Sequence, residues 1–134
     1  MRVFLNGQMV PEEQALVPLQ DHGLLYGDGL FETLRVRGGR PLWWDRHLTR
    51  LSEGAAFLRI VLPFSSMELR AAAAGLIREN EMPEAALRIT VTRGVGERGY
   101  SSRGTAQPTV AMTVHPVVVR PSSVRLMTAT RMRK

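Results

Sequence analysis

The chain has 134 residues, a net charge of +6 and no cysteine. This length suits a single domain with a substantial hydrophobic core. The lack of cysteine excludes disulfides and thiolate metal sites, and the histidines are scattered singly, so we expect no metal site. No stretch approaches the ~20 apolar residues needed to cross a bilayer, and no signal-like segment opens the chain. We therefore expect a cytoplasmic protein without a membrane partner.

Positive charge is spread along the chain instead of being clustered. Lys134 is the only lysine among 18 Lys and Arg side chains, and arginines occur singly from Arg2 onward. Nucleic-acid-binding proteins gather such charge in patches or along one helix face. We therefore expect no nucleic-acid partner. The charged fork of arginine also suits the carboxylate and phosphate groups of small ligands.

Two β-hairpins are predicted before residue 44. Each has a glycine-containing turn between two runs with strand-like composition. The runs are residues 2–5 and 8–10 around Asn6-Gly7, and residues 29–37 and 40–43 around Gly38-Gly39.

Two amphipathic helices are predicted next. Asp45 is a suitable N-cap for a helix that runs to about Leu58. Ser65 and Glu68 form a capping box at the start of a second helix, which ends near Asn80. Apolar residues at helical spacing give each helix one buried face. In the first helix these are Leu48, Leu51, Ala55 and Leu58, and in the second Leu69, Ala72, Ala73, Leu76 and Ile77.

Beyond residue 84 the apolar pattern changes to a period of two. Residues 85–92 and 108–115 predict an antiparallel strand pair, and about fifteen residues of glycine, serine and arginine separate them. A loop of that length in a compact domain is usually functional or disordered, and its three arginines and one tyrosine favour function. The complete pattern predicts an α+β domain, with an antiparallel sheet of five or six strands and two helices on one face.

The end of the chain predicts the entry into a second domain. Residues 121–123 read Pro-Ser-Ser, which is typical of a linker. Residues 124–128 then begin an apolar strand with almost no chain left to pair with it. We therefore expect an N-terminal α+β domain over residues 1–120. Residues 121–134 would be an interdomain linker and the first strand of a missing C-terminal domain.

The turn and strand at residues 21–35 are suited to presenting side chains. Gly27 and Gly29 bracket Asp28, so the backbone here can adopt positive φ or run close to another surface. An ordinary glycine turn into a β-strand would explain the same pattern, because glycine motifs alone are weak indicators. The segments that follow change the balance between these two interpretations.

Three segments together carry a resemblance to a known family. They are residues 26–35, the HLTRL segment at 47–51 and the loop at 93–100. In their order and spacing the chain resembles the N-terminal domain of the class IV aminotransferases, which are pyridoxal-phosphate enzymes of fold type IV. This family includes branched-chain aminotransferases, D-amino-acid aminotransferases and aminodeoxychorismate lyases. The resemblance covers essentially the whole chain.

The resemblance implies roles for four side chains. Arg50 is similar to the family arginine that binds the phosphate of the cofactor, pyridoxal 5'-phosphate, and a guanidinium fork suits a phosphate dianion. Tyr26, Phe31 and Thr33 resemble positions that line the substrate pocket, and strand alternation places Phe31 and Thr33 on one face. Two plainer interpretations stay open. Arg50 would then be a solvated helix residue, and Phe31 a core side chain.

The loop sequence RGVGERGYS is similar to that of aminodeoxychorismate lyases. D-amino-acid aminotransferases carry a carboxylate-binding arginine at the position of Arg98 and a histidine at that of Tyr100. The resemblance implies that Arg98 binds a substrate carboxylate and that the Tyr100 hydroxyl donates a hydrogen bond to the substrate. In this family the loop often serves the site of the neighbouring subunit, which implies a homodimer.

The activity that the resemblance implies is that of 4-amino-4-deoxychorismate lyase, a folate-pathway enzyme. This enzyme eliminates pyruvate from a small amino substrate to give 4-aminobenzoate. A class IV aminotransferase that acts on branched-chain or D-amino acids is the alternative, and a catalytically inert binding module is a further one. The Schiff-base lysine of the family is expected beyond Lys134, so we expect this chain alone to be inactive.

Overall fold

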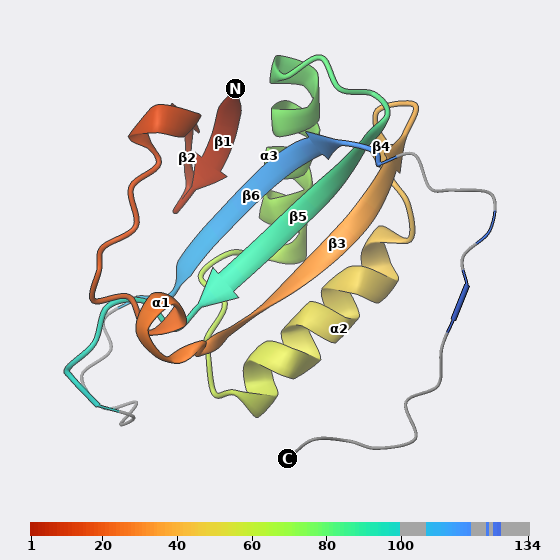
Figure 1. Ribbon diagram of the computed structural model, residues 1–134. Coiled ribbons are helices and arrows are strands. Elements are labelled where there is room, and N and C mark those ends of the chain that lie inside the picture. The colour runs from red at the N-terminus through yellow and green to blue at the C-terminus, as the bar shows by residue number, and fades with distance from the viewer. Residues whose placement is uncertain (100–106, 119–122, 124, 127–134) are drawn as a thin grey trace.

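The computed structural model describes residues 1–99, 107–118, 123 and 125–126 (Figure 1). Over these residues, no helix has both the length and the apolar character required to cross a membrane. The strands and helices, in chain order, are β1 (Arg2–Leu5), β2 (Gln8–Pro11), the 3-10 helix η1 (Glu12–Gln14), α1 (His22–Tyr26), β3 (Gly29–Arg37), β4 (Arg40–Pro41), α2 (Trp44–Phe57), α3 (Ser66–Glu79), β5 (Ala85–Thr92) and β6 (Thr109–Pro116).

Six strands form one antiparallel sheet in the order β2-β1-β6-β5-β3-β4. The longest pairings join β5 to β3 on one side and to β6 on the other. Their register sets Arg88 of β5 opposite Thr33 of β3 and opposite Thr113 of β6. This sheet confirms the expected α+β class.

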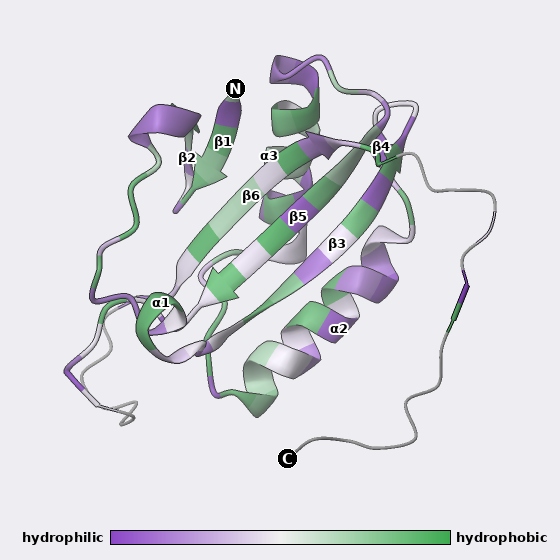
Figure 2. Ribbon diagram, in the orientation of Figure 1, coloured by the Kyte–Doolittle hydropathy of each residue, from purple (hydrophilic) through white to green (hydrophobic). Residues whose placement is uncertain are grey.

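Both long helices cover the same face of the sheet (Figure 1). Helix α2 packs along β3, and α3 packs against β1 and β6. Hydropathy alternates along β3 and β5 (Figure 2), so that one face of each strand is apolar and packs against the helices. The core between sheet and helices includes the fully buried side chains Leu34, Val36, Leu51, Ala73, Leu76, Leu87, Ile89, Val91, Met112 and Val114.

The two helix starts differ in how they are capped. At α3 the predicted capping box is present: the Glu68 amide donates to Ser65 Oγ at 3.2 Å, and the Ser65 amide donates to Glu68 Oε2 at 2.7 Å. At α2 the predicted cap at Asp45 is wrong. The N-cap is Trp43, in a left-handed conformation at φ 50° and without a side-chain cap. Asp45 lies within the first turn, where its negative charge interacts favourably with the positive end of the helix dipole.

Other boundaries also differ from the sequence pattern. The strand expected at 40–43 is only the two residues of β4, because the left-handed Trp43 turns the chain into α2. The short helix α1 was not predicted, and it begins where the Asp21 carboxylate accepts a hydrogen bond from the Gly23 amide. The linker and strand expected at 121–128 fall largely outside the described residues. The division into two domains therefore stays a prediction.

Candidate functional site

Strand β3 presents different side chains on its two faces. Phe31 and Thr33 lie on the face away from the helices, and 54% of Phe31 is exposed, so Phe31 is not a core side chain. Glu32 points the opposite way and is 4% exposed. The predicted pairing of Phe31 with Thr33 on one face is confirmed. The Glu32 carboxylate is thus buried on the opposite face of β3 from Phe31 and Thr33, the two residues predicted to line the substrate pocket.

Helix α2 supplies the partners of the buried Glu32 carboxylate. Arg50 donates from Nε and Nη2 to the two carboxylate oxygens, each at 2.5 Å, in a bidentate pair. Nδ1 of His47 lies 2.7 Å from Glu32 Oε2. His47 and Arg50 are three residues apart, so one face of the helix brings both to the same strand residue. The HLTRL segment is therefore joined to β3 through Glu32.

The charges in this cluster shift the pKa of the Glu32 carboxyl and of the Arg50 guanidinium. The hydrogen bond from Arg50 lowers the pKa of Glu32 below its usual range, while burial opposes this effect and His47 adds to it. The same hydrogen bond and the nearby negative charge raise the pKa of Arg50. Glu32 is therefore held as a carboxylate, and Arg50 as a fixed positive charge, at neutral pH.

Two hollows meet at the edge of the sheet next to β3. One, of about 380 Å³, is lined by Trp43, Arg46, His47 and Arg50. The other, of about 730 Å³, includes Trp43 and His47 again, together with Thr33 from the exposed sheet face and residues 115–118. Since both hollows share Trp43 and His47, the region of Arg50 adjoins that of Thr33. The predicted cofactor residue and one predicted substrate residue thus line adjoining spaces.

The residues of the smaller hollow fit a phosphate group. The Arg50 side chain is 71% exposed although it is paired with Glu32, so it can still reach a ligand. Among the described residues, its third nitrogen, Nη1, has no hydrogen-bond partner. Arg46 adds a second positive charge to the lining, and Trp43 adds an apolar wall. Fixed guanidinium donors beside an apolar surface are a suitable donor set for the phosphate of pyridoxal 5'-phosphate.

A second group of contacts fastens the first part of the loop after β5. The buried Asp21 side chain accepts from the Gly23 amide at 2.7 Å, from Thr92 Oγ1 at 2.9 Å and from Thr109 Oγ1 at 2.6 Å. The adjoining His22 amide donates to the Gly94 carbonyl at 2.9 Å. Helix α1 is thereby attached to β5, to β6 and to the start of the loop.

The same helix holds the loop further along. Nε2 of the buried His22 lies 2.9 Å from the Glu97 carbonyl, and the Gly99 amide donates to the Tyr26 hydroxyl at 2.9 Å. The rings of His22 and Tyr26 meet edge to face at 4.9 Å. Arg98, between these two attachment points, is exposed. Tyr26 and Arg98, both predicted as substrate residues, are therefore neighbours. Tyr100 lies outside the described residues.

An arginine clamp closes the base of this loop. Arg93 pairs with the Asp28 carboxylate at 2.5 Å and donates to the Leu58 carbonyl at 2.7 Å. The clamp joins the glycine turn before β3 to the end of α2. The turn is therefore a connection point as well as a bend.

Sequence reasoning missed the structural roles of Glu32 and Asp21. A signal for Glu32 was present, since Leu34 and Val36 are core residues and alternation puts Glu32 on their face. No local signal could reveal the partners of Asp21 in β5 and β6, which lie 71 and 88 positions away. The described lining of the two hollows does not include Tyr26, Phe31 or Arg98.

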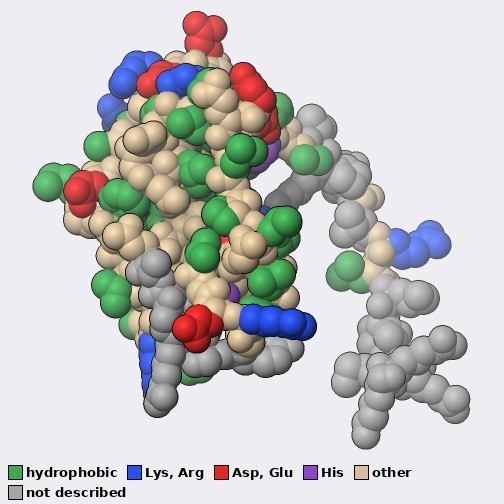
Figure 3. Space-filling model, turned by 90° about the vertical axis from the view of Figure 1, so that its left-hand side faces the viewer, with side chains coloured by type: hydrophobic (Ala, Val, Ile, Leu, Met, Phe, Trp, Pro, Cys, Tyr) green, Lys and Arg blue, Asp and Glu red, His purple; other side chains and the backbone are tan. Residues whose placement is uncertain are grey.

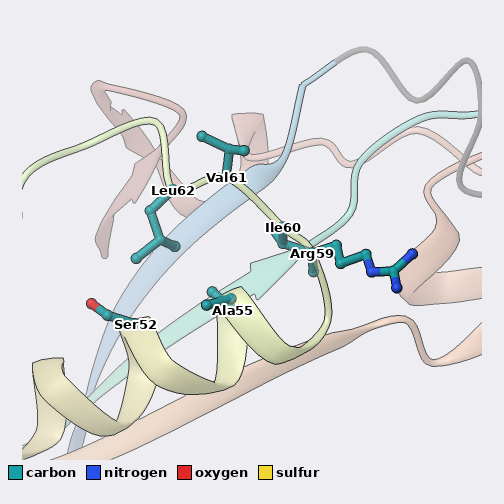
Figure 4. Close-up of a pocket in the computed structure, with 7 residues that line it drawn as sticks. Ser52, Ala55, Arg59, Ile60, Val61 and Leu62 are labelled. Atoms are coloured by element: carbon teal, nitrogen blue, oxygen red, sulfur yellow. The ribbon is translucent and has the colours of Figure 1, made fainter.

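A third hollow, of about 470 Å³, lies between the end of α2 and the segment after it (Figure 4). Its lining includes Ser52, Ala55, Arg59 and residues 60–62, and it is mainly apolar. It contains none of the predicted site residues. We therefore place the candidate site at the edge of β3 and on the exposed sheet face.

Comparison with known proteins gives a consistent result. A sequence model of the family described as amino-transferase class IV matches residues 29–134. The chain is 38% identical over 117 residues to a candidate branched-chain-amino-acid aminotransferase of Methanocaldococcus jannaschii. This alignment covers 87% of this chain and 41% of that protein. It is 37% identical over 95 residues to the D-alanine aminotransferase of Listeria monocytogenes serotype 4b. That alignment covers 71% of this chain and 33% of that protein.

A solved structure extends the comparison to three dimensions. The crystal structure of 4-amino-4-deoxychorismate lyase from Pseudomonas aeruginosa matches with a TM-score of 0.72 and 35% identity, over 89% of this chain and 41% of that one. Fold and sequence thus point to the same class, the class IV aminotransferases, whose members are pyridoxal-phosphate-dependent enzymes of fold type IV. The chain belongs to the class IV aminotransferase family. It spans less than half of the length of each of these relatives.

Proposed function

We propose that this chain is the N-terminal part of a 4-amino-4-deoxychorismate lyase, which releases pyruvate and forms 4-aminobenzoate. The observation that carries the proposal is the loop at 93–99, which helix α1 holds so that Arg98 is exposed beside Tyr26. The sequence of this loop is similar to that of the lyases. We propose this activity for a longer protein that also contains the part of the relatives that this chain does not cover.

Arg50 would hold the cofactor phosphate in this proposal. Its Nη1 donor and exposed position suit an anion, and the Glu32 pair fixes the orientation of the guanidinium. When bound, pyridoxal phosphate supplies an electron sink for charge that develops at the carbon next to the substrate amine. The catalytic lysine would come from the part of the enzyme beyond this chain. The 134-residue chain alone would therefore be inactive.

The other residues of this chain would bind and orient the substrate. Arg98 would pair with one substrate carboxylate through its planar fork. The exposed Phe31 ring gives the sheet face an apolar surface that excludes water from the substrate ring. Thr33 would add a hydroxyl donor or acceptor on the same face. The role of Tyr26 would be to hold the Arg98 loop, since its hydroxyl accepts from Gly99.

An aminotransferase that acts on branched-chain or D-amino acids is the second candidate. The identities of 38% and 37% to an archaeal and a bacterial aminotransferase favour it. The two candidates differ in product. A lyase releases pyruvate without an amino acceptor, whereas an aminotransferase needs an oxo acid to accept the amine.

The decisive experiment uses the complete enzyme that carries this sequence. It is loaded with pyridoxal phosphate and given 4-amino-4-deoxychorismate, and both pyruvate and 4-aminobenzoate are measured. Separate assays supply D-alanine or L-leucine with 2-oxoglutarate. We expect pyruvate and 4-aminobenzoate in equal amounts without an oxo acid. Transamination of either amino acid, with no release of 4-aminobenzoate, would replace the lyase with the second candidate.

Arg50→Met tests the cofactor role separately. Loss of a charge-assisted hydrogen bond of about 1.5–3 kcal/mol predicts a cofactor affinity lower by about tenfold to a hundredfold. The measurement is a titration of the visible absorbance of bound cofactor. Arg70→Met is the matched control, because Arg70 lies on α3 and contacts Asp45 and Trp44 instead of the hollow. Equal cofactor affinity in the two variants would contradict the role given to Arg50.

A further inference from the structure

Asn6 and Gly7 form the turn that joins β1 to β2. Asn6 has φ 48° and Gly7 has φ 94°, and positive φ at both central residues suits a tight turn between antiparallel strands. The pairing of β1 with β6 continues into this turn. The Asn6 amide donates to the Val110 carbonyl at 2.9 Å, and the Val110 amide donates to Asn6 Oδ1 at 2.8 Å. The Asn6 side chain therefore takes the place of a backbone carbonyl at the end of the β1–β6 ladder.

The hydrogen bond from Val110 also orients the side-chain amide of Asn6. Its oxygen is directed at β6, and within the described part of the chain its nitrogen, Nδ2, has no hydrogen-bond partner. Asn6 is exposed, so ammonia formed from Nδ2 could leave into solvent. The next residue, Gly7, has no side chain to shield its backbone nitrogen. An amide with a free nitrogen beside an unshielded backbone nitrogen is the arrangement that spontaneous deamidation of asparagine requires.

Asn80, the other asparagine of the chain, is held at both ends of its amide group. Its Oδ1 accepts from the Arg2 amide at 2.8 Å, and its Nδ2 donates to the carbonyls of Arg2 and Leu76 at 3.0 and 2.8 Å. The next residue is Glu81, whose side chain shields the backbone nitrogen. Deamidation of Asn80 would have to break all of these hydrogen bonds. Asn80 is therefore an internal reference for the reactivity of Asn6.

We infer that Asn6 is a self-modification site, which reacts when the β1–β2 hairpin opens. The Gly7 nitrogen attacks Cγ of Asn6, the bond from Cγ to Nδ2 breaks, and ammonia leaves with the proton of the attacking nitrogen. Water then opens the resulting cyclic imide at one of its two carbonyl carbons. The product is aspartate, or isoaspartate where the backbone now runs through Cγ. The reaction involves only this chain and water, so it is independent of the proposed function.

The closed hairpin restrains this reaction, and the product prevents its return. Cγ of Asn6 reaches the Gly7 nitrogen only after the hydrogen bond to Val110 has broken. Gly7 also lies against Phe64, since a Cβ on Gly7 would meet that ring at 3.5 Å, and Phe64 packs edge to face on the core residue Phe4. Isoaspartate adds an extra carbon to the backbone of the turn, so the hairpin cannot regain both contacts. The modification is therefore a permanent record of hairpin opening.

The first test follows deamidation of the 134-residue chain at mildly alkaline pH, in buffer and in guanidinium chloride. Mass spectrometry of peptides measures conversion at Asn6 and Asn80, and an isoaspartyl methyltransferase identifies isoaspartate. In buffer, conversion at Asn6 should be faster than at Asn80. It should also be slower by about tenfold or more than in the unfolded chain, because the hydrogen bonds of the turn must break first. Equal rates at Asn6 in the two solutions, or conversion in buffer no faster than at Asn80, would overturn the inference.

Two variants separate the chemistry from its control by the fold. Gly7→Ala shields the attacking nitrogen and should slow conversion at Asn6 in guanidinium chloride, where folding plays no part. Phe64→Leu removes the ring beside Gly7 and should speed conversion in buffer while leaving the rate in guanidinium chloride unchanged. Phe57→Leu is the matched control, because Phe57 is exposed at the end of α2. An unchanged rate for Gly7→Ala, or equal rates in buffer for Phe64→Leu and Phe57→Leu, would contradict the inference.

Discussion

At the scale of single residues, Glu32 sets the electrostatics of the candidate site. Its carboxylate is buried beside β3, and Arg50 and His47 approach it from one helix. The carboxylate accepts hydrogen bonds from Nε and Nη2 of Arg50 and thereby fixes the plane of the guanidinium. Arg50 therefore presents the same edge to any anion that enters the hollow.

Glu32→Gln should destabilise the chain in a pH-dependent way. The substitution keeps the shape of the side chain but removes its charge, and the expected loss is about 1–3 kcal/mol at neutral pH. Because folding lowers the pKa of Glu32, its contribution is fully present above the unfolded pKa of about 4.3. It is lost as the pH falls through the lower folded value. Urea unfolding of both proteins across this range measures the difference.

Glu53→Gln is the control, since Glu53 is an exposed residue of the same helix. It should change the unfolding free energy by less than about 0.5 kcal/mol at every pH. A stability difference between wild type and Glu32→Gln that stays constant down to the acid limit would refute the assigned role of the Glu32 charge.

At the scale of elements, two glycines have opposite expected responses to alanine. Gly94 has φ 83°, and a Cβ there would lie 1.8 Å from the Gln107 carbonyl oxygen. Gly75 lies inside α3, where a Cβ would meet the ends of the Met9 and Arg78 side chains at 3.5 and 3.9 Å, which is ordinary van der Waals contact. The first position has no room for a side chain, whereas the second has.

Gly94→Ala should destabilise the chain by about 2 kcal/mol or more, because the new methyl group forces the backbone of the loop apart. Gly75→Ala should stabilise it by about 0.5–1 kcal/mol through helix propensity. Thermal unfolding of the two variants measures both signs. If Gly94→Ala were as stable as the wild type, the packing of residue 94 against residue 107 would be wrong.

The elements that sequence predicted correctly are those whose determinants are local. The capping box of α3 depends on two residues three positions apart, and the core faces of β3 and β5 repeat every second residue. Helix α1 is five residues long, and its cap, Asp21, also binds Thr92 and Thr109 from distant strands. Likewise, the helix partners of Glu32 become visible only when α2 packs on β3. Such contacts depend on the tertiary structure, so local sequence patterns could not predict them.

At the scale of the whole molecule, apolar side chains gather on the side that carries β2 and the connector to α1. Figure 3 shows several hydrophobic side chains on this side of the molecule. The connector and α1 contribute the exposed residues Leu16, Leu19, Leu24 and Leu25. Exposed leucines on one connector and the helix that follows it form a candidate protein–protein interface. We propose that a second copy of this chain covers it, in agreement with the expected homodimer.

Leu24→Glu tests this arrangement, because Leu24 is 61% exposed and its replacement should not disturb the fold. Sedimentation equilibrium should show a dimer for the wild type and a monomer for the variant, since a buried charge opposes association. Phe57→Glu is the control. Phe57 is 87% exposed at the end of α2, and its replacement should leave the dimer intact. A monomeric wild type at micromolar concentration would rule out this interface.

The attachment of the loop at 94–99 to α1 has a consequence for the thermodynamics of recognition. His22 and Tyr26 restrict this segment through hydrogen bonds at Gly94, Glu97 and Gly99 that form when the chain folds. Ordering a free backbone costs about 1–2 kcal/mol per residue, and here that entropy loss occurs during folding. In the proposed role of Arg98, ligand binding would then require little further ordering of these residues. We therefore expect the proposed site to discriminate ligands by shape and charge, because a poorly fitting ligand would gain nothing from loop adaptability.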